Sequence, residues 1–134
     1  MALNYRITKR KNNIKNPEQT QYIMQAVSKG VIDLEKVCYD ISHQCTLSES
    51  DVIGVVTALG NKLHDSLEQG YTVDLGDLGR FKLTFKGTAA PEPKLLSKRS
   101  IQKFILNYQP SKRMKNKLKK SITLVKDRKG ISKL

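Results

Sequence analysis

Residues 71–86 read YTVDLGDLGRFKLTFK, and their pattern is the clearest structural signal in the sequence. Apolar and polar residues alternate over 71–75 and again over 81–86, as they do in strands with one buried face. Gly76 and Gly79 lie between the two runs and predict a tight turn, because glycine tolerates positive φ. The segment therefore predicts two paired strands. One face is apolar, and the other offers lysines to solvent or to phosphate.

Two helices are predicted before this strand pair. Asp33 can cap the first helix, which we expect to run to about Cys45 with one apolar stripe. Ser48 and Asp51 form an S-x-x-D capping box that predicts the start of the second helix. Gly70 is a favoured residue just beyond a helix end, so we expect this helix to stop there.

The segment after the strand pair is long, basic and poor in residues to bury. Residues 87–100 connect two predicted strands, although strands need no connection of about fifteen residues. We therefore expect the connection to have a function. Strand alternation resumes over 101–108, Pro110 ends it, and Ser111 can cap a last helix over 112–120. The basic tail, 121–134, is expected to be frayed.

A further pair of strands is predicted at the N-terminus. Residues 4–9 and 21–28 alternate partly between apolar and polar, and the polar segment between them contains Pro17. The predicted order is two strands, two helices, two strands, a long basic connection, one strand and one helix. This order predicts an α+β fold.

The charge is unevenly distributed along the 134 residues. The formal net charge is +13, made of +4 over 1–33, −6 over 34–79 and +15 over 80–134. Such segregation indicates a binding face for a polyanion, whereas solubility alone would not require it.

We expect no disulfide between Cys38 and Cys45, because two helical turns separate them by roughly 10 Å. Reduced thiols and the absence of an apolar leader predict a cytoplasmic protein without a membrane span.

Residues 34 to about 120 resemble the HU and integration host factor family of bacterial histone-like DNA-binding proteins. The likeness is carried by VDLGDLGRF at 73–81, by the long arm that follows, and by FILNYQPSKRMKNKL at 104–118. The basic N-terminal extension resembles that of longer HU-related proteins of Bacteroides-like bacteria. The resemblance implies an intertwined homodimer or heterodimer with a helical body, a three-stranded sheet and a protruding β-hairpin arm at about 86–103. It divides the chain into an extension (1–30), an HU-like domain (31–120) and a tail (121–134).

The resemblance also implies a function in the nucleoid. Family members bind and bend double-stranded DNA with low sequence specificity. Their arms lie in the minor groove, and their Lys and Arg side chains contact phosphates. They condense DNA and are not enzymes. Pro93 matches the proline that wedges between base pairs. No metal, cofactor or small-molecule substrate is expected. The DNA-binding residues implied are Arg80, Lys82, Lys86, Pro93, Lys94, Lys98, Arg99, Lys103, Lys112 and Arg113.

Two other functions remain open at this point. The basic tail and the N-terminal strands would suit an RNA-binding or ribosome-associated protein, although exposed stacking aromatics are not evident. The positive charge could instead bind an acidic protein partner or a cell-surface polymer. We expect the N-terminal extension to add strands to the edge of the body and to provide a further phosphate contact surface.

Overall fold

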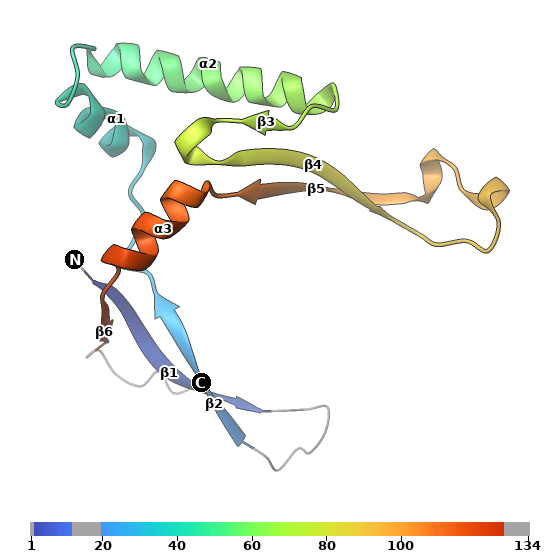
Figure 1. Cartoon of the computed structure of the whole chain (residues 1–134), viewed down its shortest axis with the longest axis horizontal. Coiled ribbons are helices and arrows are strands. Elements are labelled where there is room, and N and C mark those ends of the chain that lie inside the picture. Colours follow the sequence, from blue (N-terminus) through green and yellow to red (C-terminus); the bar gives the residue numbers. More distant parts are fainter. Residues whose placement is uncertain (1, 12–19, 128–134) are drawn as a thin grey trace. The chain divides into compact units, whose positions relative to one another are not determined.

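The computed structural model describes residues 2–11 and 20–127, which contain three α-helices and two three-stranded sheets. The expected α+β class is confirmed. The chain divides into two compact units, residues 1–33 with 118–134, and residues 34–117. Figure 1 shows the elements of each unit.

The first unit is built on a β-hairpin of β1 (Leu3–Lys11) and β2 (Thr20–Val27), which pair antiparallel along their whole length. The predicted pair of N-terminal strands is thus confirmed. In the described residues the sheet order is β2-β1-β6, so this hairpin shares no strand with the other sheet. The polar connection around Pro17 lies outside the described residues.

The third strand of this sheet is β6 (Leu124–Lys126), which pairs in parallel with the start of β1. The backbone N–H of Leu3 donates to the Thr123 carbonyl (2.8 Å), and that of Asp127 donates to the Tyr5 carbonyl (2.9 Å). The frayed tail expected from residue 121 onward is therefore wrong up to 126. The reason is that the free edge of β1 offers hydrogen bonds to an apolar, β-prone segment. Residues 128–134 lie outside the described part.

The second unit begins with α1 (Leu34–Ser42) and α2 (Glu49–Glu68). The first helix ends before the expected Cys45. The Ser48 side chain accepts a hydrogen bond from the Asp51 backbone N–H (3.2 Å), so the predicted cap of α2 is confirmed. Gly70 has φ +90°, which suits the predicted stop. Both cysteines are free, and Cys38 is buried.

The second sheet has the order β3-β4-β5, with β3 (Val73–Asp74), β4 (Arg80–Gly87) and β5 (Ile101–Gln109) antiparallel. The first of these strands is shorter than predicted, because the chain enters the 3₁₀ turn η1 (Gly76–Leu78) directly after Leu75. The last helix, α3 (Lys112–Ser121), begins where expected, with Ser111 Oγ accepting from the Met114 backbone N–H (3.1 Å).

Few apolar side chains of the described residues are removed from solvent. Only Cys38, Val52 and Leu67 are buried. Val55 on α2 and Phe104 on β5 remain 59% and 67% exposed. A single copy of the chain thus leaves much of its apolar surface in contact with water.

Gly79 allows the start of β4 to approach the end of β5, and we expect Gly79→Ala to be strongly destabilising. Its φ is +118°, and an added Cβ would overlap the Gln109 carbonyl oxygen and lie 2.9 Å from Cα of Pro110. Both neighbours are backbone atoms that cannot move independently. The free energy of unfolding, measured by denaturant titration, should fall by about 3 kcal/mol or more, from backbone strain plus overlap.

Gly70→Ala is the matched control, because Gly70 also has positive φ but a Cβ there would meet nothing within 4 Å. It should cost only the conformational penalty of about 1–2 kcal/mol. Equal losses for the two variants would contradict the steric role of Gly79.

Candidate nucleic-acid interface

The pairing of β4 with β5 sorts their side chains onto two faces. Lys82 lies opposite Asn107 and Lys86 opposite Lys103, so these basic and polar residues share one side of the hairpin. The three lysines are exposed and have no hydrogen-bond or ion-pair partner among the described residues. We call this side the basic face; its members are Arg80, Lys82, Thr84, Lys86, Lys103, Ile105, Asn107 and Gln109.

The middle of the basic face is held by a cross-strand hydrogen bond. Asn107 Nδ2 donates to Thr84 Oγ1 at 3.0 Å, and this hydroxyl donates to the Ile105 carbonyl at 3.4 Å. Sequence reasoning did not single out Thr84 or Asn107. Strand alternation alone would have placed Thr84 beside Lys82 and Lys86, but the position of Asn107 depends on the register.

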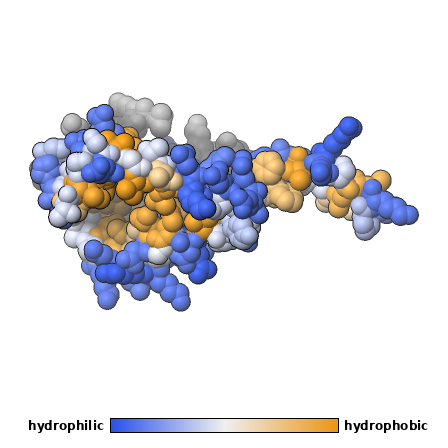
Figure 2. Space-filling model, turned by 90° about the horizontal axis from the view of Figure 1, so that it is seen from above, coloured by the Kyte–Doolittle hydropathy of each residue, from blue (hydrophilic) through white to orange (hydrophobic). Residues whose placement is uncertain are grey.

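The other side of the hairpin is aromatic and aliphatic. Phe81 packs against Tyr108 with ring centroids 5.1 Å apart, and Phe85 meets Phe104 edge-on at 6.4 Å. The Tyr108 hydroxyl donates to the Leu78 carbonyl at 2.5 Å, which ties β5 to the η1 turn. Figure 2 shows hydrophobic residues (orange) at the surface of the projecting segment formed by β4, β5 and their connection. We call this side the apolar face; its members are Phe81, Leu83, Phe85, Phe104, Leu106 and Tyr108.

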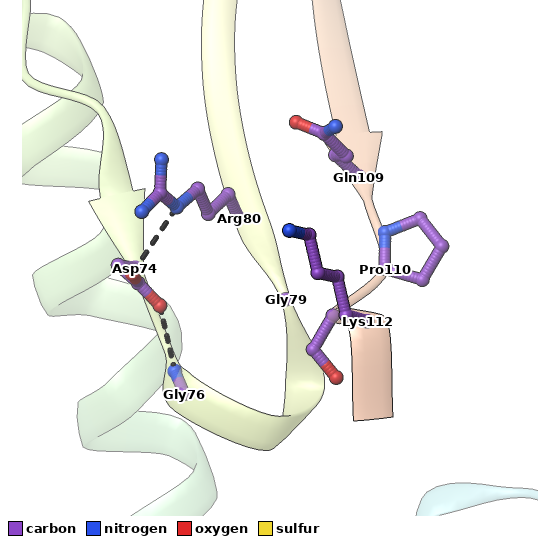
Figure 3. A pocket seen from close by; sticks show the side chains of 8 residues that line it. Asp74, Gly76, Gly79, Arg80, Gln109, Pro110 and Lys112 are labelled. Carbon is purple, nitrogen blue, oxygen red and sulfur yellow. Dashed lines mark hydrogen bonds and ion pairs between the residues drawn. The ribbon is translucent and has the colours of Figure 1, made fainter. Parts of the chain in front are cut away.

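A pocket of about 350 Å³ lies where the β3–β4 turn meets the start of α3. Asp74 Oδ1 accepts from the Gly76 backbone N–H (2.9 Å) and Oδ2 from Arg80 Nε (3.1 Å), as Figure 3 shows. The hydrogen bond from Gly76 is the main cause that lowers the pKa of Asp74. Partial desolvation opposes it, and the hydrogen bond and charge of Arg80 lower the pKa further.

The start of α3 is joined to the same turn through Asp77. Ser111 Oγ donates to the Asp77 carbonyl (2.7 Å), and Arg113 Nη1 pairs with Asp77 Oδ2 (3.0 Å). Lys112 lines the pocket beside Arg80 (Figure 3). Two of the predicted DNA-binding residues, Arg80 and Arg113, thus already engage a carboxylate of the chain, whereas Lys112 has no partner among the described residues.

The connection between β4 and β5 has a local structure of its own. It contains the 3₁₀ turns η2 (Pro93–Leu95) and η3 (Lys98–Ser100). Ser97 and Ser100 form a reciprocal capping box, and the Thr88 backbone N–H donates to the Ser100 carbonyl at 3.0 Å. The expected site residues here are all exposed: Pro93, Lys94, Lys98 and Arg99.

One exposed cluster of metal-ligating side chains exists in the described part of the chain. His64 Nδ1 lies 3.6 Å from Asp65, and His64 Nε2 lies 3.4 Å from Glu68. All three side chains are exposed on α2, and exposed acidic groups of this kind are common without a bound ion. None of the described helices is long and apolar enough to cross a membrane.

Comparison with known proteins gives one family and one fold. The family model described as an HU domain fused to a wHTH, Ig or glycine-rich motif matches residues 1–126. The structure resembles a crystal structure from Bacteroides vulgatus, of a protein named as a candidate bacterial DNA-binding protein, with a TM-score of 0.67 and 14% identity. The match covers 96% of this chain and 50% of that one, so this chain spans half the length of that protein. No curated protein matches the sequence closely.

The Asp74 carboxyl should titrate below its ordinary pKa of 3.8. Because folding lowers the pKa of this carboxyl, its ionised form stabilises the folded state at pH values above the ordinary pKa. This stabilisation is lost as the pH falls through the lowered pKa of the folded state. Arg80→Ala should raise the pKa only part of the way, because the Gly76 hydrogen bond is the larger cause. Carboxyl NMR shifts followed against pH check this. Full return to the ordinary value in Arg80→Ala would contradict the role of Gly76.

Proposed function

Because the chain belongs to the family of HU domains fused to a wHTH, Ig or glycine-rich motif, we propose that it binds and bends duplex DNA with little sequence preference. The observation that carries the proposal is the basic face, on which Lys82, Lys86 and Lys103 have no acceptor among the described residues. The proposed role is architectural, in the nucleoid, and involves no catalysis.

The chemistry of the basic face suits phosphates rather than bases. Lys82 and Lys86 are four residues apart on one strand, about 13 Å along its axis, and Lys103 lies opposite Lys86. Lysine acts as a flexible point charge, so it neutralises phosphates without requiring one base sequence. Each neutralised phosphate releases counterions, which supplies affinity independent of sequence. The carboxylate at the end of this face, Asp74, is compensated by Arg80.

The connection between the strands supplies the arm. Its cations Lys94, Lys98 and Arg99 are exposed and would follow the minor groove. Pro93, at the start of η2, would act as a wedge that unstacks a base step. Lys112 and Arg113 would contact phosphates beside the hairpin, Arg113 after exchanging its Asp77 partner.

We propose that two copies of the chain form the DNA-binding body. Val55 on α2 is 59% exposed, and Leu106 on the apolar face is 56% exposed. A second copy would remove these side chains from water, and a dimer would present two arms. The apolar area left exposed by one copy supports this assembly.

The lysines of the basic face should determine how affinity responds to salt. Replacing Lys82, Lys86 and Lys103 together by Gln should weaken binding to a duplex of random sequence. The slope of log K against log salt should become shallower by about 0.9 for each phosphate that is no longer neutralised. A matched triple variant, Lys36, Lys62 and Lys120 to Gln, removes the same charge from α1, α2 and α3. Fluorescence anisotropy from low to moderate salt measures both slopes.

Equal slopes in the two triple variants would contradict the role of the basic face. Tighter binding to a structured RNA than to straight, nicked or four-way DNA would favour the RNA-binding alternative. Pro93→Ala, added to the same series, should retain affinity but bend a doubly labelled duplex less, as read by resonance energy transfer. An unchanged bend would rule out the wedge.

Dimerisation should depend on the exposed side of α2. The wild-type mass in solution, measured by light scattering, should be twice that of the chain. Val55→Glu should shift it toward one copy, because the glutamate would be buried unpaired in the interface. Lys62→Glu is the control, at a polar position of the same helix. A monomeric wild type, or a dimeric Val55→Glu protein at low micromolar concentration, would contradict the proposed body.

A further inference from the structure

The β1–β2 hairpin also separates its side chains into two chemically different faces. Arg6 lies opposite Gln25, and Arg10 lies opposite Gln21. Between the two Arg–Gln pairs, Thr8 lies opposite Ile23. We call this side the Arg–Gln face; its members are Arg6, Thr8, Arg10, Gln21, Ile23 and Gln25. The opposite side carries Ile7, Tyr22 and Met24 together with one cation, Lys9.

The Arg–Gln face has free hydrogen-bonding capacity and no carboxylate. Arg10, Gln21 and Gln25 are exposed, and Arg6 is half-buried. None of these four side chains has a hydrogen-bond or ion-pair partner among the described residues. Guanidinium and amide groups are planar donors that match phosphate oxygens and the major-groove edges of bases. The basic face of β4–β5, by contrast, offers mostly lysines.

Over most of its length, this hairpin has two strands in the described part of the chain. β6 pairs with Leu3–Tyr5, and from Arg6 onward no third strand lies beside β1 and β2 among residues 2–11 and 20–127. A two-stranded ribbon is an element that the major groove of B-form DNA admits. Arg6 and Arg10 are about 13 Å apart along this ribbon. Next to Arg6, an open groove of about 700 Å³ is also lined by Lys29, which adds a cation at the same end, and by Asp127.

We propose that the β1–β2 ribbon is a second DNA-binding element that enters the major groove with its Arg–Gln face. Arg6 and Arg10 contact phosphates and purine acceptors, and Gln21 and Gln25 hydrogen-bond to base edges. B-form DNA is the ligand rather than duplex RNA, because the major groove of A-form RNA is too deep and narrow for side chains to read. This inference rests on the proposed function, since both hairpins bind the same duplex.

Two pairs of substitutions separate charge from hydrogen bonding. Arg6→Ala with Arg10→Ala should weaken duplex binding roughly tenfold or more and make the salt dependence shallower. Lys9→Ala with Lys62→Ala removes the same charge and should do less. Gln21→Ala with Gln25→Ala should weaken binding severalfold at an unchanged salt slope. Its control is Gln44→Ala with Gln69→Ala, outside the hairpin. Circular dichroism and thermal unfolding confirm that each variant remains folded.

A modified duplex tests the groove directly. Replacing purines by 7-deazapurines removes the N7 acceptor from the major groove and leaves the minor groove and the phosphates unchanged. Wild-type affinity should fall on this duplex, and the variant lacking Gln21 and Gln25 should show a smaller fall. The inference is overturned if wild type binds both duplexes equally, or if either N-terminal variant matches its control.

The failure of this inference is distinguishable from failure of the proposed function. Should the triple lysine variant of β4–β5 lose salt-dependent binding while the N-terminal variants match their controls, only the second element is refuted. Should the wild-type chain show no salt-dependent binding to duplex DNA, both proposals fall together.

Discussion

The antiparallel pairing of β4 with β5 determines where the charge of the second unit lies. With Phe81 opposite Tyr108 and Lys86 opposite Lys103, every lysine of the two strands lies on one face and every aromatic ring on the other. A register shift of one residue would turn the whole side-chain set of one strand over and bring lysines among the rings. The two aromatic pairs and the hydrogen bond from Asn107 to Thr84 favour the observed register.

The register in turn depends on how the hairpin is joined to its neighbours, and here the acidic residues have a structural use. Asp77 receives Arg113 through its carboxylate and Ser111 through its carbonyl, so the start of α3 is held against the η1 turn. Gly79 then permits the close approach of the end of β5. Two carboxylates beside the hairpin, Asp74 and Asp77, are kept near Arg80 and Arg113, which would reduce their repulsion of a bound phosphate.

Local signals in the sequence were sufficient for most of the fold. The N-cap at Ser48, the stop at Gly70 and strand alternation over 81–86 are all encoded by neighbouring residues, and the structure confirms them. The strand β6 was missed because it is only three residues long and gains its hydrogen bonds from β1, more than a hundred positions away. The Arg80 and Arg113 ion pairs were missed for a similar reason. The sequence alone does not show which carboxylate the fold places next to a basic residue beside a turn. Register across a long connection is not encoded locally either, so the Arg–Gln pairs of β1 and β2 were not foreseen.

The two hairpins apply one rule with different side chains. In each, alternation gives a donor-rich face and an apolar face, yet β4–β5 uses mostly lysine where β1–β2 uses arginine and glutamine. Lysine needs only a negative charge nearby, so the proposed contacts of β4–β5 tolerate any DNA sequence. Guanidinium and amide groups need acceptors in a particular geometry, so the proposed contacts of β1–β2 depend on the groups that a base edge presents. The apolar faces impose a further condition. A chain that buries only three apolar side chains in its described part has little core of its own, so its folding and the proposed pairing of copies would be one coupled equilibrium. DNA, by binding only the paired form, would then stabilise the fold as well as the complex.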